Sequence, residues 1–211
     1  MKRSFGILTT ILTVTLIFTF TACTTTGGGK NSTDATKVYD REYTIGDEGP
    51  AGGFVFFDKG DSTGGWRYLE AAPAETEFKN VIWTELVVNV TGGLPEKATG
   101  TETGIGTGKR NTEILVAHLN SRNETGKAAH VCAELSVNGF SDWFLPSYAE
   151  LNLMYENLRK NNIGGFTDGW YWSSSVYTRD YHDAWGQNFL FGYGEGSYGN
   201  YGGIVRAVRA F

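Results

Sequence analysis

The chain contains little of several residue types, and each shortage excludes a class of protein. Its 211 residues include only 2 Cys, 4 Pro and 3 His. Two cysteines cannot build a disulfide-rich scaffold, and the Cys and His residues show no metal-ligand spacing. With so few prolines, and with glycines that follow no three-residue period, a collagen-like chain is also excluded.

Basic residues are scarce as well. Lys and Arg number 18 against 23 Asp and Glu, so the formal net charge is −5. Removal of residues 1–22 would take away two cations and no acid, which gives 16 − 23 = −7. Because nucleic-acid binding requires clustered Lys and Arg against phosphates, we expect no nucleic-acid partner.

Glycine and aromatic residues are abundant. The chain has 29 Gly, about twice the average usage, and 14% of its residues are aromatic. Apolar residues make up 40% of the chain, which is enough for a core and excludes wholesale disorder. This composition favours short strands joined by tight turns.

The first 22 residues have the pattern of a secretion signal. Lys2 and Arg3 give a basic start, and Ser4–Ala22 is an uncharged, largely apolar stretch that ends in small residues. The alternative is an N-terminal transmembrane anchor, since the stretch is long enough to span a bilayer. Its threonines and the cysteine that follows favour cleavage.

Cys23 follows Phe20-Thr21-Ala22, which resembles a bacterial lipoprotein processing site with Phe in place of the usual Leu. The resemblance implies that Cys23 carries the lipid. Thr24, rather than Asp, favours export to the outer membrane by analogy with lipoprotein sorting. Residues 23–40 are rich in Thr and Gly and predict a flexible tether, which leaves residues 41–211 as one domain.

A lipid on Cys23 would leave Cys132 without a disulfide partner. Cys132 lies in the apolar run Ala128–Ala133, so we predict a buried, inert thiol. The alternative is a catalytic pair with His130. That spacing disfavours it, because residues two apart on a helix point in different directions.

The order of the elements predicts an α+β fold. Phe54–Phe57 and Trp66–Glu70 are strand-like runs around a polar turn, typical of a hairpin. Ile204–Phe211 alternates as a final strand. Strands at both ends, with two helices between them, favour pairing of the terminal strands.

Two helices can be placed. Ser147 and Glu150 form a capping-box pattern ahead of the second. Its apolar face has helical spacing: Leu151, Met154, Tyr155 and Leu158. The first helix is predicted to be capped by Asn111 or Thr112. The glycines before Lys109 do not match a phosphate loop, so we expect no phosphate site and no cofactor.

The stretch 177–203 is the candidate for ligand binding. It combines Tyr with Gly, Ser and Asn, a composition used by recognition loops because Tyr gives contact area at low entropy cost. The candidate binding residues are Arg179, Tyr181, Tyr193, Tyr198, Asn200 and Tyr201. The alternative is a mobile hairpin with incidental tyrosines.

The sequence contains no recognisable set of catalytic residues. Ser173, His182 and Asp183 form the one Ser/His/Asp grouping, but adjacent His and Asp are poorly placed for an orienting pair. No Gly-x-Ser-x-Gly motif occurs. We therefore expect neither enzymatic activity nor a metal.

Four segments resemble the Lcl C-terminal domain family, named for a collagen-like Legionella adhesin. They are Gly49–Phe57, Gly139–Ser147 followed by Glu150-Leu151, Tyr171–Ser174 and Val205–Arg209. Their order and spacing agree over about residues 43–211. The resemblance implies a C-type-lectin-like α+β domain with a small antiparallel sheet, paired N- and C-terminal strands, two helices and long loops.

The same resemblance implies a secreted or surface-attached protein. The named adhesin binds sulfated glycans and forms trimers, so a homo-oligomer is an open alternative. The acidic charge of this chain is poorly suited to sulfated polymers, because anion recognition favours Arg and Lys. The formylglycine-generating enzymes of the same group need a cysteine-based copper site, which one free cysteine does not supply.

Two of these segments also carry structural expectations. We expect Trp143 to pack beneath the second helix and Asp142 to bind backbone amides in its turn. Arg206 and Arg209 are expected to form internal ion pairs with carboxylates such as Asp142 or Glu150.

Taken together, these patterns predict a lipid-anchored envelope protein at the outer membrane or cell surface. Its domain would be non-catalytic and would serve adhesion, or recognition of a glycan or of a host or envelope protein. The alternative is a structural or assembly protein of the envelope with no soluble ligand.

Overall fold

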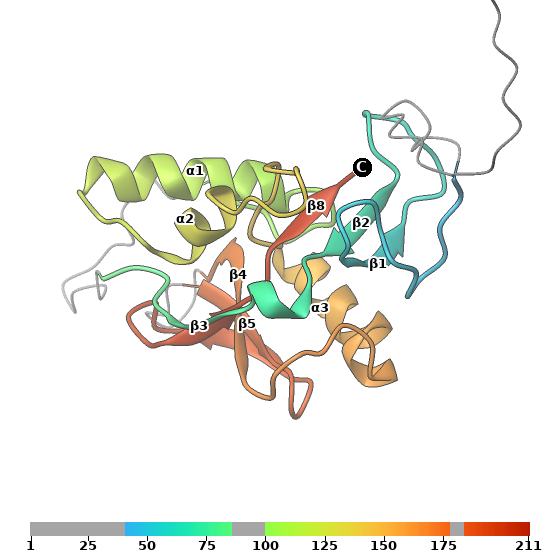
Figure 1. The fold of residues 1–211 in the computed structure, drawn as a ribbon. Helices are drawn as coiled ribbons and strands as arrows, with labels where there is room; N and C mark the ends of the chain where they lie inside the picture. The colour runs from blue at the N-terminus through green and yellow to red at the C-terminus, as the bar shows by residue number, and fades with distance from the viewer. Residues whose placement is uncertain (1–40, 86–99, 178–183) are drawn as a thin grey trace, which may run out of the picture. The chain divides into compact units, whose positions relative to one another are not determined.

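The computed structural model describes residues 41–85, 100–177 and 184–211, which all belong to one compact unit, Lys37–Phe211. These residues form three α-helices and eight β-strands arranged in two sheets (Figure 1). The prediction of an α+β fold is therefore confirmed. Within the described residues, no helix has the length and hydropathy needed to span a membrane.

The first sheet contains the predicted hairpin and the last strand of the chain. Its order is β1 (Phe54–Asp58), β2 (Tyr68–Ala71) and β8 (Val208–Ala210), all antiparallel. β8 pairs with β2 and not with β1, so the N-terminal hairpin meets the C-terminal strand through its second strand. The reason is that the outer edge of β1 is already bonded to residues 46–47, through Val55.

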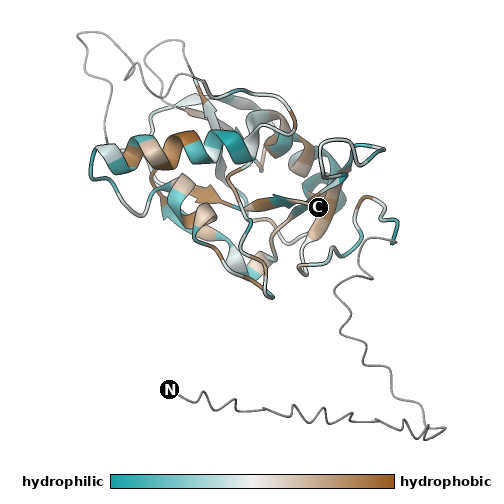
Figure 2. Ribbon diagram, turned by 90° about the horizontal axis from the view of Figure 1, so that it is seen from above, coloured by the Kyte–Doolittle hydropathy of each residue, from teal (hydrophilic) through white to brown (hydrophobic). Residues whose placement is uncertain are grey.

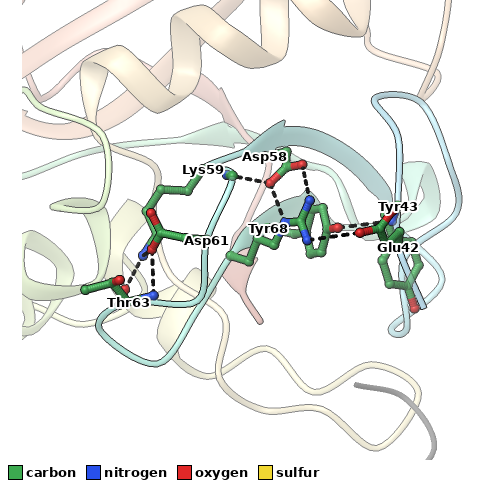
Figure 3. Close-up of polar contacts among 9 residues, drawn as sticks. Glu42, Tyr43, Asp58, Lys59, Asp61, Thr63 and Tyr68 are labelled. Atoms are coloured by element: carbon green, nitrogen blue, oxygen red, sulfur yellow. Dashed lines mark hydrogen bonds and ion pairs between the residues drawn. The ribbon is translucent and has the colours of Figure 1, made fainter. Parts of the chain in front are cut away.

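Charged side chains close the loop between β1 and β2. The Asp58 carboxylate accepts hydrogen bonds from Nε and Nη2 of Arg67 at 2.8 and 3.0 Å. Asp58 also accepts from the Gly60 amide, and Asp61 accepts from the Thr63 amide, both at 2.7 Å (Figure 3). These aspartates hold the polar turn that the sequence indicated.

The second sheet has five strands and mixed direction. Its order is β3 (Phe78–Val81), β7 (Gly203–Val205), β4 (Trp170–Val176), β5 (Ala184–Asn188) and β6 (Gly194–Ser197). β4 and β7 run parallel, and the other pairs are antiparallel. The expectation of one small antiparallel sheet was therefore too simple.

The helices are α1 (Gly108–Ser121), α2 (Ala128–Ala133) and α3 (Tyr148–Asn157), with short 3-10 turns at Ala74–Thr76 and Arg159–Asn161. The expectation of two helices missed α2, because six residues are too few to show helical periodicity. The capping box of α3 is confirmed. The Ser147 amide donates to the Glu150 carboxylate at 2.7 Å, and the Glu150 amide donates to Ser147 Oγ at 3.3 Å.

Helix α1 begins earlier than predicted, with Thr107 as its N-cap. Asn111 and Thr112, the predicted caps, are buried inside the helix. The cause is the buried carboxylate of Glu150, which accepts the amides of Gly106 at 2.7 Å and Gly108 at 3.4 Å. A side chain from another helix thus accepts hydrogen bonds from backbone amides at the start of α1. Local sequence patterns cannot reveal such a distant partner.

Strand β4 separates two hydrophobic cores. Trp172 points into a core with α1 and α2 that includes Leu115 and Trp143, whereas Tyr171 points into a core with α3 that includes Met154. Adjacent residues of a strand face opposite sides of the sheet, so one dipeptide supplies both cores. Figure 2 shows hydrophobic and hydrophilic bands alternating along α1, consistent with one face packed on the sheet.

Two arginines near the C-terminus are buried with carboxylates. Arg209 donates to Asp142 from Nε and Nη2 at 2.8 and 2.9 Å, and to Glu70 from Nη1 at 2.9 Å. The expected internal ion pair with Asp142 is confirmed. Asp142 was also expected to bind backbone amides in its turn, and besides Arg209 its carboxylate accepts a hydrogen bond from its own amide.

Arg206 pairs with Glu77 and not with Glu150. Its Nη2 donates to Glu77 Oε2 at 2.7 Å, and its Nη1 donates to the carbonyls of Ala72 and Gly164 at 3.1 and 2.9 Å. Burial opposes ionisation of Glu77, but hydrogen bonds from Thr167 and Tyr171 and the charge of Arg206 hold its pKa below the ordinary value. The Glu77 carboxyl is therefore ionised at neutral pH.

We predict that Arg206→Met lowers the free energy of unfolding by about 3–5 kcal/mol, because it leaves Glu77 buried without its cation. Chemical denaturation measures this loss. The double variant Arg206→Met/Glu77→Gln is the matched control, and it should recover part of the loss since no charge is then stranded. A single variant as stable as the native chain would contradict this role of the pair.

Candidate functional site

The structure does not bring the predicted binding residues into one site. Arg179 and Tyr181 lie outside the described residues. Tyr193 precedes β6, whereas Tyr198, Asn200 and Tyr201 follow it. Five residues of extended chain span about 16 Å, so the candidates fall at two ends of one edge strand.

One end is the tyrosine turn, defined as Tyr198–Tyr201. The rings of Tyr198 and Tyr201 meet edge to face with centroids 5.8 Å apart. The Tyr201 side chain is 58% exposed, and Asn200 is exposed beside it. This turn presents an open aromatic ring next to a side-chain amide.

The tyrosine turn is held by Trp83 and Thr84, which follow the end of β3. The Gly199 carbonyl accepts the amides of Trp83 at 2.7 Å and Thr84 at 3.1 Å, and the Tyr201 amide donates to the Tyr198 carbonyl at 3.2 Å. Trp83 is itself buried, and its Nε1 donates to the Ser173 carbonyl at 2.9 Å. Tyr198 and Tyr201 therefore sit on a turn that is hydrogen-bonded to residues packed on the core.

The other end is the hairpin tip, defined as residues 189–193 between β5 and β6. Its exposed side chains are Leu190, Phe191 and Tyr193, with exposed fractions of 50%, 70% and 50%. Sequence reasoning selected Tyr193 and missed the other two. The signal was present as two large apolar residues between Phe189 and Gly192, a position where a turn is normally polar.

Glycines of β6 belong to a packed strand and not to a recognition loop. A Cβ on Gly194 would lie 2.2 Å from Tyr148 Oη, and one on Gly196 would lie 2.4 Å from Tyr177 Cδ1. The rings of Tyr148 and Tyr177 also contact Trp185, with centroids 4.5 and 4.6 Å away. The alternation of Gly and Tyr in this stretch thus serves ring packing over part of its length.

The described residues that were considered for catalysis are buried or form hydrogen bonds within the fold. Cys132 is fully buried, and desolvation raises the pKa of its thiol, which makes it a poor nucleophile. His130 Nδ1 accepts the Lys127 amide, and its Nε2 lies 3.1 Å from Asn120 Oδ1. The buried Ser173 hydroxyl donates to the Trp185 carbonyl at 2.8 Å.

His182 and Asp183 lie outside the described residues. Within residues 41–85, 100–177 and 184–211, no three side chains of His, Cys, Asp or Glu converge to hold a metal ion. The described geometry therefore offers exposed rings as its candidate binding features.

No protein-family model matches the chain, and no curated protein matches it.

We predict that Gly196→Ala destabilises the protein by about 1–3 kcal/mol, since its Cβ would overlap the Tyr177 ring in a packed region. Gly104→Ala is the matched control. Its Cβ would meet only Thr107 Cγ2 at 3.8 Å, so it should leave stability nearly unchanged. Thermal unfolding of the two variants provides the comparison, and equal effects would refute ring packing as the reason for glycine in β6.

Proposed function

We propose that this protein is a lipid-anchored component of a bacterial envelope whose domain binds a glycan or a protein without catalysis. The signal pattern and Cys23 support the anchor. The α+β fold, in which the N-terminal hairpin pairs with the C-terminal strand, suits the C-type-lectin-like arrangement implied by the resemblance to the Lcl C-terminal domain family.

The observation that carries the binding proposal is the tyrosine turn. An exposed Tyr201 ring on a turn bonded to Trp83 and Thr84 loses little conformational freedom when it meets a ligand. Its face offers a flat apolar surface, and its hydroxyl and the neighbouring Asn200 amide offer hydrogen bonds. This combination suits the alternating apolar and hydroxyl-bearing faces of a sugar.

The charge of the chain narrows the ligand class. With a net charge of −5, and of −7 once residues 1–22 are removed, long-range electrostatics oppose approach of a polyanion. A neutral glycan or a neutral protein surface fits the tyrosine turn better than a sulfated polymer does.

We predict that Tyr201→Ala lowers affinity for a bound glycan about tenfold, because a central aromatic contact is lost. A glycan array probed with the native chain identifies the ligand, and titration of the variant gives the affinity. Tyr193→Ala, at the far end of β6, is the matched control and should bind as the native chain does. Absence of glycan binding by the native chain would rule out a glycan ligand and leave a protein ligand or the structural or assembly role.

A separate prediction concerns the lipid anchor at Cys23. In the bacterial envelope, the mature chain should begin at Cys23 and carry lipid on that residue. Intact-mass spectrometry of the protein extracted from membranes measures this directly. A mature chain with unmodified Cys23 would overturn the anchor without affecting the binding proposal.

A further inference from the structure

The hairpin tip carries apolar side chains at the outermost point of an edge hairpin. Leu190 and Phe191 occupy the turn between β5 and β6, and Tyr193 follows them. The Phe191 and Tyr193 rings are nearly parallel, at 11°, with centroids 6.4 Å apart. The Tyr193 ring lies 6.4 Å from that of Trp170, so aromatic rings extend from the tip back toward the sheet.

The backbone amides of the hairpin tip donate hydrogen bonds within the protein and do not depend on water. Asn188 Oδ1 accepts the amides of Leu190 at 2.9 Å and Phe191 at 3.0 Å, and the Asn188 carbonyl accepts the Gly192 amide at 2.7 Å. An unpaired amide is costly to remove from water, and these donors are all paired within the protein. The tip can therefore leave water without stranding these amides.

The tip is also rigidly supported. Phe189 is buried and stacks on Tyr171, with centroids 4.1 Å apart. Gly192 has a φ of +86°, and a Cβ there would lie 2.4 Å from Tyr155 Oη of α3. The backbone of the tip is thus packed against the core on both sides of the turn, and Leu190, Phe191 and Tyr193 are left exposed.

The size of this surface argues against a soluble protein partner. A stable protein interface buries about 800 Å² on each side, whereas three half-exposed side chains of this size offer about 300 Å². A bilayer requires no complementary surface. Its interface accepts aromatic rings, and its acyl region accepts Leu and Phe.

The length of the tether allows this contact. Residues 23–40 can extend to about 60 Å, whereas a domain of this size has a radius of gyration of about 15–16 Å. Either end of the domain can therefore reach the membrane that holds Cys23. Attachment also keeps the tip at a high local concentration next to the lipid, so a weak contact is sufficient.

From these observations we propose that the hairpin tip inserts into the surface of the lipid bilayer and forms a second, reversible membrane contact. The proposal rests on the lipid anchor of the proposed function. It also deepens that function, because the tyrosine turn lies at the other end of β6 and would be directed away from the membrane. Exposed Glu195 and the acidic chain favour a zwitterionic lipid over an anionic one.

The test places a fluorescent probe at the tip. Phe191→Cys is labelled with an environment-sensitive dye in the mature lipoprotein on phosphatidylcholine vesicles that contain brominated lipid. Buried Cys132 does not compete for the dye. Ile105→Cys, an exposed apolar position in the loop before α1, is the matched control. We expect several-fold stronger quenching at position 191 than at position 105.

A second arm separates this inference from the anchor. The mature chain 23–211 with Cys23→Ala carries the same probes and is titrated with the same vesicles. Quenching at position 191 should persist at high lipid concentration. Leu190→Ser should weaken partition roughly tenfold, because one large apolar side chain no longer leaves water.

The quenching results distinguish insertion of the tip from its alternatives. Equal quenching at positions 191 and 105, or none in either arm, overturns insertion of the tip. A probe response at position 191 that depends on protein concentration without lipid assigns the tip to a second copy of the chain and also overturns it. Failure of the lipidated chain to stay on vesicles, with quenching retained in the second arm, overturns only the anchor.

Discussion

The fold depends on two buried arginines in the last six residues of the chain. Arg209 joins Glu70 of β2 to Asp142, and Arg206 joins Glu77 and the Ala72 carbonyl to the segment between β7 and β8. Each guanidinium is stable in the interior only while its carboxylates are in place. Glu70, Ala72 and Glu77 come from the first half of the domain, so these contacts join the C-terminal segment to residues 129–139 positions earlier in the chain.

The five-stranded sheet connects the buried arginine pairs to the tyrosine turn and the hairpin tip. β7 precedes Arg206 and pairs with β4, which pairs with β5, which pairs with β6. The edge strand β6 is short and packed by rings over Gly194 and Gly196, so its two ends are held apart by a rigid unit. A polar, tyrosine-bearing turn lies at one end and an apolar tip at the other. Two different contacts can therefore be made in opposite directions.

Local sequence patterns correctly predicted the features that depend on a few neighbouring residues or on charge. The capping box at Ser147, the hairpin of β1 and β2, and the internal ion pair of Arg209 all follow from neighbouring residues or from charges that need burial. It did not predict the start of α1, because Glu150 supplies the cap from a distant helix. It grouped Tyr193 with Tyr201, because composition shows that both occur among glycines but not that β6 lies between them. Leu190 and Phe191 were missed because an apolar run such as Phe189–Phe191 is typical of a strand and not of an exposed turn.

The central claim is that the domain presents the tyrosine turn outward and the hairpin tip to the lipid. The most direct measurement is labelling of the membrane-attached lipoprotein with a membrane-impermeant thiol reagent, using Tyr201→Cys and Phe191→Cys, while buried Cys132 stays unreactive. The account predicts rapid labelling at position 201, and protection at position 191 that detergent removes. Equal labelling at both positions before detergent, or protection at position 201 alone, would contradict it.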